Sequence, residues 1–87
     1  MQLQDPCVRH VLQYLNETLP SAGQVTFQEV TGAKVCQKYT VRQIGEALEL
    51  LRRNGLVKAA SRFGCSELLS FTAFAVTEEG TRFLKAK

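Results

Sequence analysis

The sequence has little that could carry catalysis. It contains one histidine and no tryptophan, and no acid–base pair or nucleophile motif accompanies His10. His10 falls near the polar edge of a helical apolar stripe, where a surface position is the simpler interpretation. We therefore expect neither enzymatic activity nor a cofactor.

Long apolar runs are also missing. A membrane-spanning helix needs about 18 or more consecutive apolar residues, and the chain has no such run. Residues 1–6 lack the basic start and apolar core of a secretion signal. We expect an intracellular protein with no membrane partner, nuclear in a eukaryote and cytoplasmic in a prokaryote.

Cysteines are few and odd in number: Cys7, Cys36 and Cys65. An odd count without a secretion signal argues against a disulfide framework. Cys7 and His10 share a helix face and could hold a metal, but no Cys-x-x-Cys pair completes such a site. We favour thiols that serve as small hydrophobes and expect no metal; a redox or metal role for the three stays open.

Positive charge is concentrated in the middle of the chain. The net charge of +3 conceals a net −2 over residues 1–33 and zero over 67–87. Residues 34–66 hold seven basic and two acidic side chains. A surface that faces nucleic-acid phosphates needs such a concentration, although chance clustering on a solvated surface remains the alternative.

Helix patterns occupy most of the chain, which at 87 residues predicts a single domain. After a flexible segment 1–5, Asp5 and Pro6 begin a helix over 6–19 that Pro20 ends. Capping boxes at Thr26 and Thr40 begin helices over 27–33 and 40–54. The apolar face of the latter comprises Val41, Ile44, Ala47, Leu48 and Leu51.

A β-hairpin over 57–76 is expected next, with a short strand near 24–25 as a further element. Residues 62–67 are polar and contain Gly64, so they read as its connection. The returning strand is apolar on both faces, which predicts either a bulge or an exposed apolar patch for a partner. Thr77 then begins a last helix over 78–85.

The order of these segments resembles the winged helix superfamily. The similarity is carried by Asn54-Gly55-Leu56-Val57, which closes a helix, and by Val76-Thr77-Glu78-Glu79-Gly80, which opens one. It implies an α+β fold in one winged helix-turn-helix domain, with a three-helix core, a β-hairpin wing and a C-terminal helix. Such domains bind DNA in some proteins and other proteins in others.

A narrower similarity is to the RQC domain of RecQ-type helicases, particularly the Werner-type version. Segments 25–34, 55–63 and 74–87 carry it. The resemblance implies a role in DNA repair or transcription regulation, and an aromatic wing tip at Phe63 that separates base pairs. Because the chain has no Gly-x-x-x-x-Gly-Lys-[Ser/Thr] phosphate loop, it would be a module without a motor.

The DNA-binding hypothesis assigns base and phosphate contacts to different segments. Base edges fall to Tyr39, Thr40, Arg42, Gln43 and Glu46, and phosphates to Lys34, Lys38, Lys58 and Arg62. Glu46 and Glu49 lie at the centre of the helix face opposite the core, paired with Arg42 and Arg53. Two acids there oppose docking against phosphates, so we expect the wing pair Arg62 and Phe63 to dominate binding to duplex or forked DNA.

The alternative is a protein-interaction or dimerisation module without direct DNA binding. It would use the apolar residues of the returning strand, Leu69 and Phe71, against a protein partner or a second copy.

Overall fold

The computed structural model describes residues 2–64 and 67–85. These residues form an α+β domain. Its elements, in chain order, are α1 (Pro6–Ala22), β1 (Val25–Thr26), α2 (Phe27–Gly32), the 3-10 helix η1 (Lys34–Cys36), α3 (Val41–Arg53), β2 (Val57–Gly64), β3 (Glu67–Val76) and α4 (Glu78–Lys85). The expected α+β class is confirmed. No helix in this part of the chain is long and apolar enough to span a membrane.

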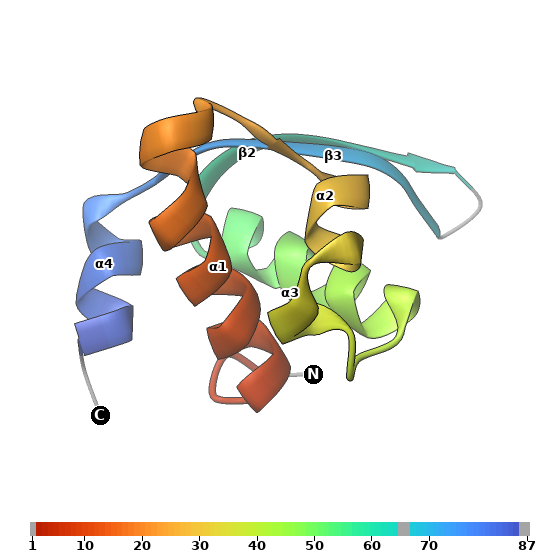
Figure 1. The fold of residues 1–87 in the computed structure, drawn as a ribbon, viewed down its shortest axis with the longest axis horizontal. Helices are drawn as coiled ribbons and strands as arrows, with labels where there is room; N and C mark the ends of the chain where they lie inside the picture. The colour runs from red at the N-terminus through yellow and green to blue at the C-terminus, as the bar shows by residue number, and fades with distance from the viewer. Residues whose placement is uncertain (1, 65–66, 86–87) are drawn as a thin grey trace.

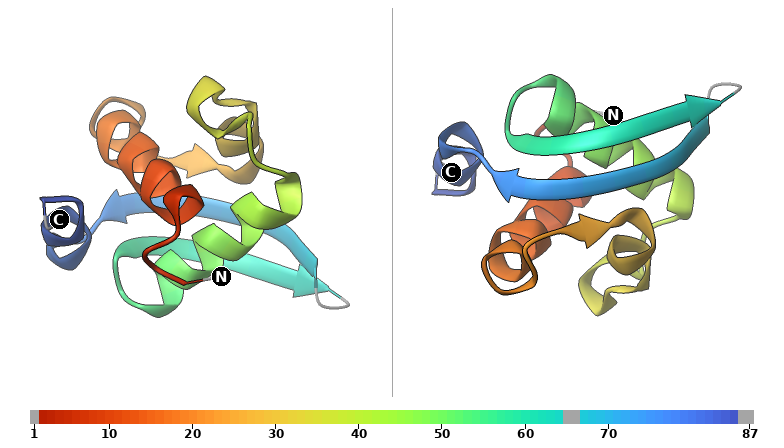
Figure 2. Two further views of the ribbon diagram at one scale, coloured as in Figure 1. Left: turned by 90° about the horizontal axis from the view of Figure 1, so that it is seen from below. Right: turned by 90° about the horizontal axis from the view of Figure 1, so that it is seen from above.

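The domain has two layers (Figure 1). A three-stranded antiparallel sheet of order β1-β3-β2 lies over α1, α2 and α3. Helix α4 lies at one end of the sheet, and the β2–β3 hairpin extends at the other. Seen from above, the outer face of the sheet has no helix in front of it (Figure 2). The candidate surfaces are therefore the hairpin, the outer sheet face and the exposed side of α3.

The core lies between the helices and the inner face of the sheet. Phe71 of β3 is its largest fully buried side chain. The expected stripe of α1 is buried beside it: Val8, Val11, Leu12, Leu15 and Leu19. From α3 come Ile44, Ala47, Leu48 and Leu51. Burial of each large aliphatic side chain stabilises the fold by roughly 1.5–3 kcal/mol. The packing of α1 and α3 under the sheet therefore supplies much of the stability of the domain.

Helix α1 ends later than its sequence predicts. It continues through Pro20 to Ala22 and stops at Gly23, whose φ of 80° lets its N–H donate to the Leu19 carbonyl at 2.8 Å. Pro20 lies inside the last turn of α1, so the prediction that it ends the helix is wrong. Asp5 occupies the N-cap, but its carboxylate accepts from the Gln2 N–H instead of capping α1.

Helix α3 begins and ends one residue inside its predicted range of 40–54, with Thr40 and Asn54 as its caps. Thr40 and Gln43 form the complete capping box. At the other end, Gly55 takes a φ of 73°, and the Gly55 and Leu56 amides donate to the Arg52 and Leu51 carbonyls. This is a Schellman ending, and it turns Leu56 into the core. The ends of α3 are thus fixed by local side-chain and backbone bonds.

The start of α2 follows its prediction only in part. Thr26 Oγ1 accepts from the Glu29 N–H, but the Glu29 carboxylate accepts from the Thr26 hydroxyl and not from its backbone. Helix α2 ends at Gly32, one residue early, and η1 follows it without a sequence signal.

Val41 is a clearer error: assigned to the core face of α3, it is 60% exposed.

The hairpin strands are longer than expected and irregular. Strand β2 continues to Gly64 and β3 begins at Glu67, which shortens the expected connection. The pairing of β2 with β3 shifts register between Lys58 and Ala59 and again between Arg62 and Phe63. Phe71 and Phe74 lie three positions apart on β3 and so point to opposite faces: Phe71 is buried, whereas Phe74 is 48% exposed.

Because Phe71 belongs to the core, the expectation that it contacts a partner or a second copy is wrong. The side chains of Leu69 and Phe63 lie outside the part of the chain that the structure describes, as does Cys65.

Candidate nucleic-acid interface

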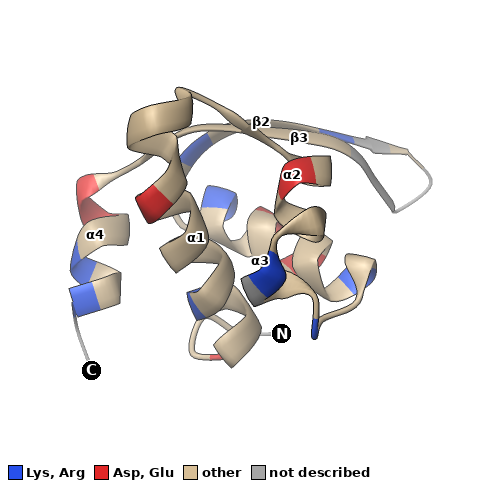
Figure 3. Cartoon of the chain, viewed as in Figure 1, with Lys and Arg blue, Asp and Glu red and all other residues tan. Residues whose placement is uncertain are grey.

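Most side chains predicted to contact DNA are exposed. They lie on η1, on the connection to α3, on the first turn of α3 and on β2; Figure 3 shows blue along these segments. The exposed residues are Lys34, Lys38, Thr40, Arg42, Gln43, Lys58 and Arg62, and Tyr39 is half-buried. The described part of the chain groups no three His, Cys, Asp or Glu side chains that could hold a metal ion.

Tyr39 anchors the connection that carries these cations. Its hydroxyl lies 2.7 Å from Nδ1 of His10 on α1, and the two ring centroids are 5.8 Å apart. The ammonium of Lys38 lies 5.4 Å from the centre of the Tyr39 ring. A base-edge role for the Tyr39 hydroxyl therefore competes with a bond that it already makes. His10 is half-buried beside this bond and lines an open hollow of the surface.

An open hollow lies beside this bond, between α1 and η1. Its volume is about 410 Å³, and its lining residues are His10, Gln13, Tyr14, Glu17, Lys34 and Lys38. Lys34 and Lys38, which the sequence places in one connection between two helices, thus line one depression together with residues of α1. Glu17 shares the lining and offsets part of their charge, which the local sequence could not show.

The first turn of α3 divides its side chains into two kinds. Thr40 Oγ1 accepts from the Gln43 N–H at 3.1 Å, and Gln43 Oε1 accepts from the Thr40 N–H at 2.8 Å. These acceptors are occupied by the helix cap. Val41 and Arg42, between them, extend into solvent with the Arg42 side chain 92% exposed.

Arg42 is only weakly held by its own helix. Its Nε lies 3.8 Å from Glu46 Oε1, and the Glu46 side chain is 52% exposed. A pair this long and this exposed stabilises a helix by less than about 1 kcal/mol. Arg42 can therefore exchange Glu46 for a phosphate or a base edge at small cost.

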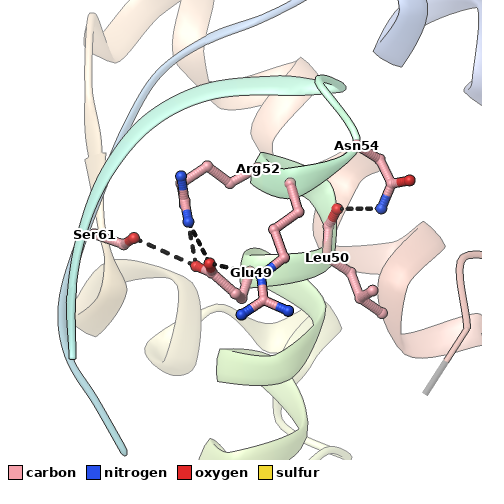
Figure 4. A network of polar contacts seen from close by, with 6 residues as sticks. Glu49, Leu50, Arg52, Asn54 and Ser61 are labelled. Atoms are coloured by element: carbon pink, nitrogen blue, oxygen red, sulfur yellow. Dashed lines mark hydrogen bonds and ion pairs between the residues drawn. The ribbon is translucent and has the colours of Figure 1, made fainter. Parts of the chain in front are cut away.

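Glu49 is not on a solvated face of α3. Glu49 is only 7% exposed. Its carboxylate accepts hydrogen bonds from Arg52, from Arg53 Nε at 3.2 Å and from Ser61 Oγ at 3.3 Å (Figure 4). The Arg52 hydrogen bond lowers the pKa of Glu49, with smaller contributions from Arg53 and Ser61, whereas burial opposes the shift. Glu49 is buried because β2 passes over this part of α3 and contributes Ser61.

The burial of Glu49 changes the charge balance of α3. The sequence pattern predicts two exposed acids at the centre of the helix surface, but only Glu46 is exposed. Arg53 keeps a side chain that is 69% exposed while it bonds to Glu49. Electrostatic repulsion of phosphates by α3 is therefore weaker than the sequence indicates. The first turn of α3 is a candidate for phosphate contact as well as the wing.

Comparison of the chain with protein-family models, with curated proteins and with solved structures found no match. A function must therefore be inferred from the chemistry of the surface itself. That surface offers exposed cations on three segments and one weakly held arginine at a helix start.

Proposed function

We propose that this chain is a non-catalytic winged helix module that binds DNA through η1 and its connection to α3, the first turn of α3 and the β2–β3 wing. The order of four helices and a three-stranded antiparallel sheet is compatible with that fold. The proposal depends most on one observation: five exposed cations lie on these segments, namely Lys34, Lys38, Arg42, Lys58 and Arg62.

Each segment has a distinct role in this mode of binding. Lys34 and Lys38 contact phosphates next to the start of α3, and the Tyr39–His10 bond holds their connection against α1. Arg42 enters the groove from the first turn of α3, where its pair with Glu46 is weak. Lys58 and Arg62 contact phosphates from the wing strand. Glu49 helps to hold the wing strand against α3, because it accepts a hydrogen bond from Ser61 of β2.

Binding of this kind must weaken steeply with salt, since cations on the protein release counterions from DNA. We expect the logarithm of the association constant for duplex DNA to fall linearly with the logarithm of salt concentration. Charge reversal by Lys38→Glu or Arg62→Glu should lower affinity for all duplex sequences alike and reduce the salt slope by about one phosphate contact each.

Lys85→Glu is the matched control, because it makes the same change of charge at an exposed residue of α4, at the opposite end of the sheet from the wing. Fluorescence anisotropy with duplex, forked and single-stranded DNA measures all three variants. A flat salt dependence, or a loss with Lys85→Glu equal to the others, would contradict the proposal. Preference for forked DNA would assign more of the binding to the wing.

A further inference from the structure

We infer that Val41 contacts the C5-methyl group of a thymine in the major groove and so sets the sequence preference of this module. The inference rests on the proposed DNA-binding function and adds a residue that reads a base.

Val41 is exposed where its spacing predicts burial. It precedes Ile44 and Leu48 on the same helical stripe, yet Ile44 is 1% and Leu48 is 0% exposed while Val41 is 60% exposed. Along with Phe74 of β3, it is one of the two large apolar side chains exposed in the described part of the chain. With 60% of its surface exposed, Val41 contributes little to the core.

Its neighbours leave Val41 and Arg42 as the free readers of this turn. In the capping box, Thr40 Oγ1 accepts from the Gln43 N–H and Gln43 Oε1 accepts from the Thr40 N–H. The Tyr39 hydroxyl is bonded to His10. Of the five side chains from Tyr39 to Gln43, only those of Val41 and Arg42 extend from the helix start without a short polar bond to the protein.

Thymine is the base that an exposed valine can distinguish. Its C5-methyl is the apolar group on the major-groove edge, and apolar side chains contact it there. Residues at the start of a helix docked in the major groove are those that reach base edges. Arg42, adjacent to Val41, is free to bond to a phosphate or a neighbouring guanine, and this would hold Val41 against the base.

Replacing thymine by deoxyuridine, which removes only the methyl group, tests the contact. A preferred duplex is first selected from a randomised pool, and each thymine is then replaced in turn. At one position we expect a loss of affinity of about three- to fivefold, the value of one buried methyl group. Val41→Ala should bring that thymine-to-uracil ratio close to one, and folding should survive because the side chain is exposed.

Phe74→Ala is the control, since it removes the other exposed apolar side chain and must leave the thymine-to-uracil ratio unchanged. A ratio near one at every position, or a ratio that persists in Val41→Ala, overturns the inference while salt-dependent binding upholds the proposed function. If the unaltered protein shows no salt-dependent binding to DNA, the proposed function and this inference are both overturned.

Discussion

At the scale of single residues, Gly80 shows how closely two elements approach. A β-carbon at this position would lie 2.3 Å from the Leu56 carbonyl oxygen and 2.7 Å from Val76 Cγ1. Thr77 fixes the same contact, because its hydroxyl donates to the Gly55 carbonyl at 2.6 Å and its N–H to the Leu56 carbonyl at 3.0 Å. The start of α4 therefore lies directly on the turn that ends α3.

We expect Gly80→Ala to lower the free energy of unfolding by about 1–3 kcal/mol, although alanine favours helix formation, because the backbone of Leu56 cannot move away cheaply. Urea unfolding followed by circular dichroism measures the change. Gly32→Ala is the control, since nothing lies within 4 Å of a β-carbon there. Equal stability of the two variants would contradict the close approach.

At the scale of elements, Glu49 joins α3 to the wing strand. It accepts from two arginines of its own helix and from Ser61 of β2. Few other polar bonds between described side chains connect distant segments, apart from the His10–Tyr39 bond. The Glu49 carboxylate therefore adds a polar contact between α3 and the wing strand to the packing of Leu56 and Val57 in the core.

The lowered pKa of Glu49 predicts a pH dependence. Stability from its ionised form is present above its usual value of 4.5 and is lost as pH falls through the lower pKa of the folded state. Glu49→Gln should cost about 1–3 kcal/mol at neutral pH and flatten the fall in stability below pH 4.5. Urea unfolding at a series of pH values measures both effects.

Glu46→Gln provides the comparison on the same helix, because the exposed Arg42–Glu46 pair is worth less than about 1 kcal/mol. If the two variants lose the same stability and keep the same pH profile, the Glu49 carboxylate does not hold α3 to β2.

At the scale of the whole molecule, two cysteines report on the integrity of the core. Cys7 of α1 and Cys36 of η1 are both free and buried. Burial is the main reason that the pKa of Cys7 rises to about 11, and the charges of Cys36, Asp5 and Glu46 add to it. The pKa of Cys36 is also raised by burial. Both thiols thus act as small core hydrophobes, as the sequence led us to expect.

In a Cys65→Ser background, which removes the thiol outside the described residues, alkylation of the folded protein at pH 8 should be far slower than in guanidinium chloride. Intact-protein mass spectrometry follows the reaction. The raised pKa of Cys7 further implies that stability is lost as pH rises from about 9 toward about 11. In this range the Cys7 thiol ionises in the unfolded chain but stays protonated in the folded one. Equal alkylation rates in the two states would rule out the packed core.

Local sequence determined the ends of α3 and the start of α4. The capping box at Thr40, the left-handed Gly55 and the Thr77 cap depend on residues within one turn of each other, so their pattern was sufficient. The α+β class and the basic segments followed from periodicity and composition for the same reason. Pro20 misled the prediction because the helix end depends on the Gly23 backbone bond.

Tertiary structure decided which of these residues is available at the surface. Val41 and Phe71 occupy equivalent apolar positions in their patterns, yet one is exposed and the other lies in the core. Glu49 is buried because β2 crosses it, and Tyr39 is held because His10, 29 residues away, lies beside it. Burial and pairing depend on contacts between segments distant in the chain, which no local pattern encodes.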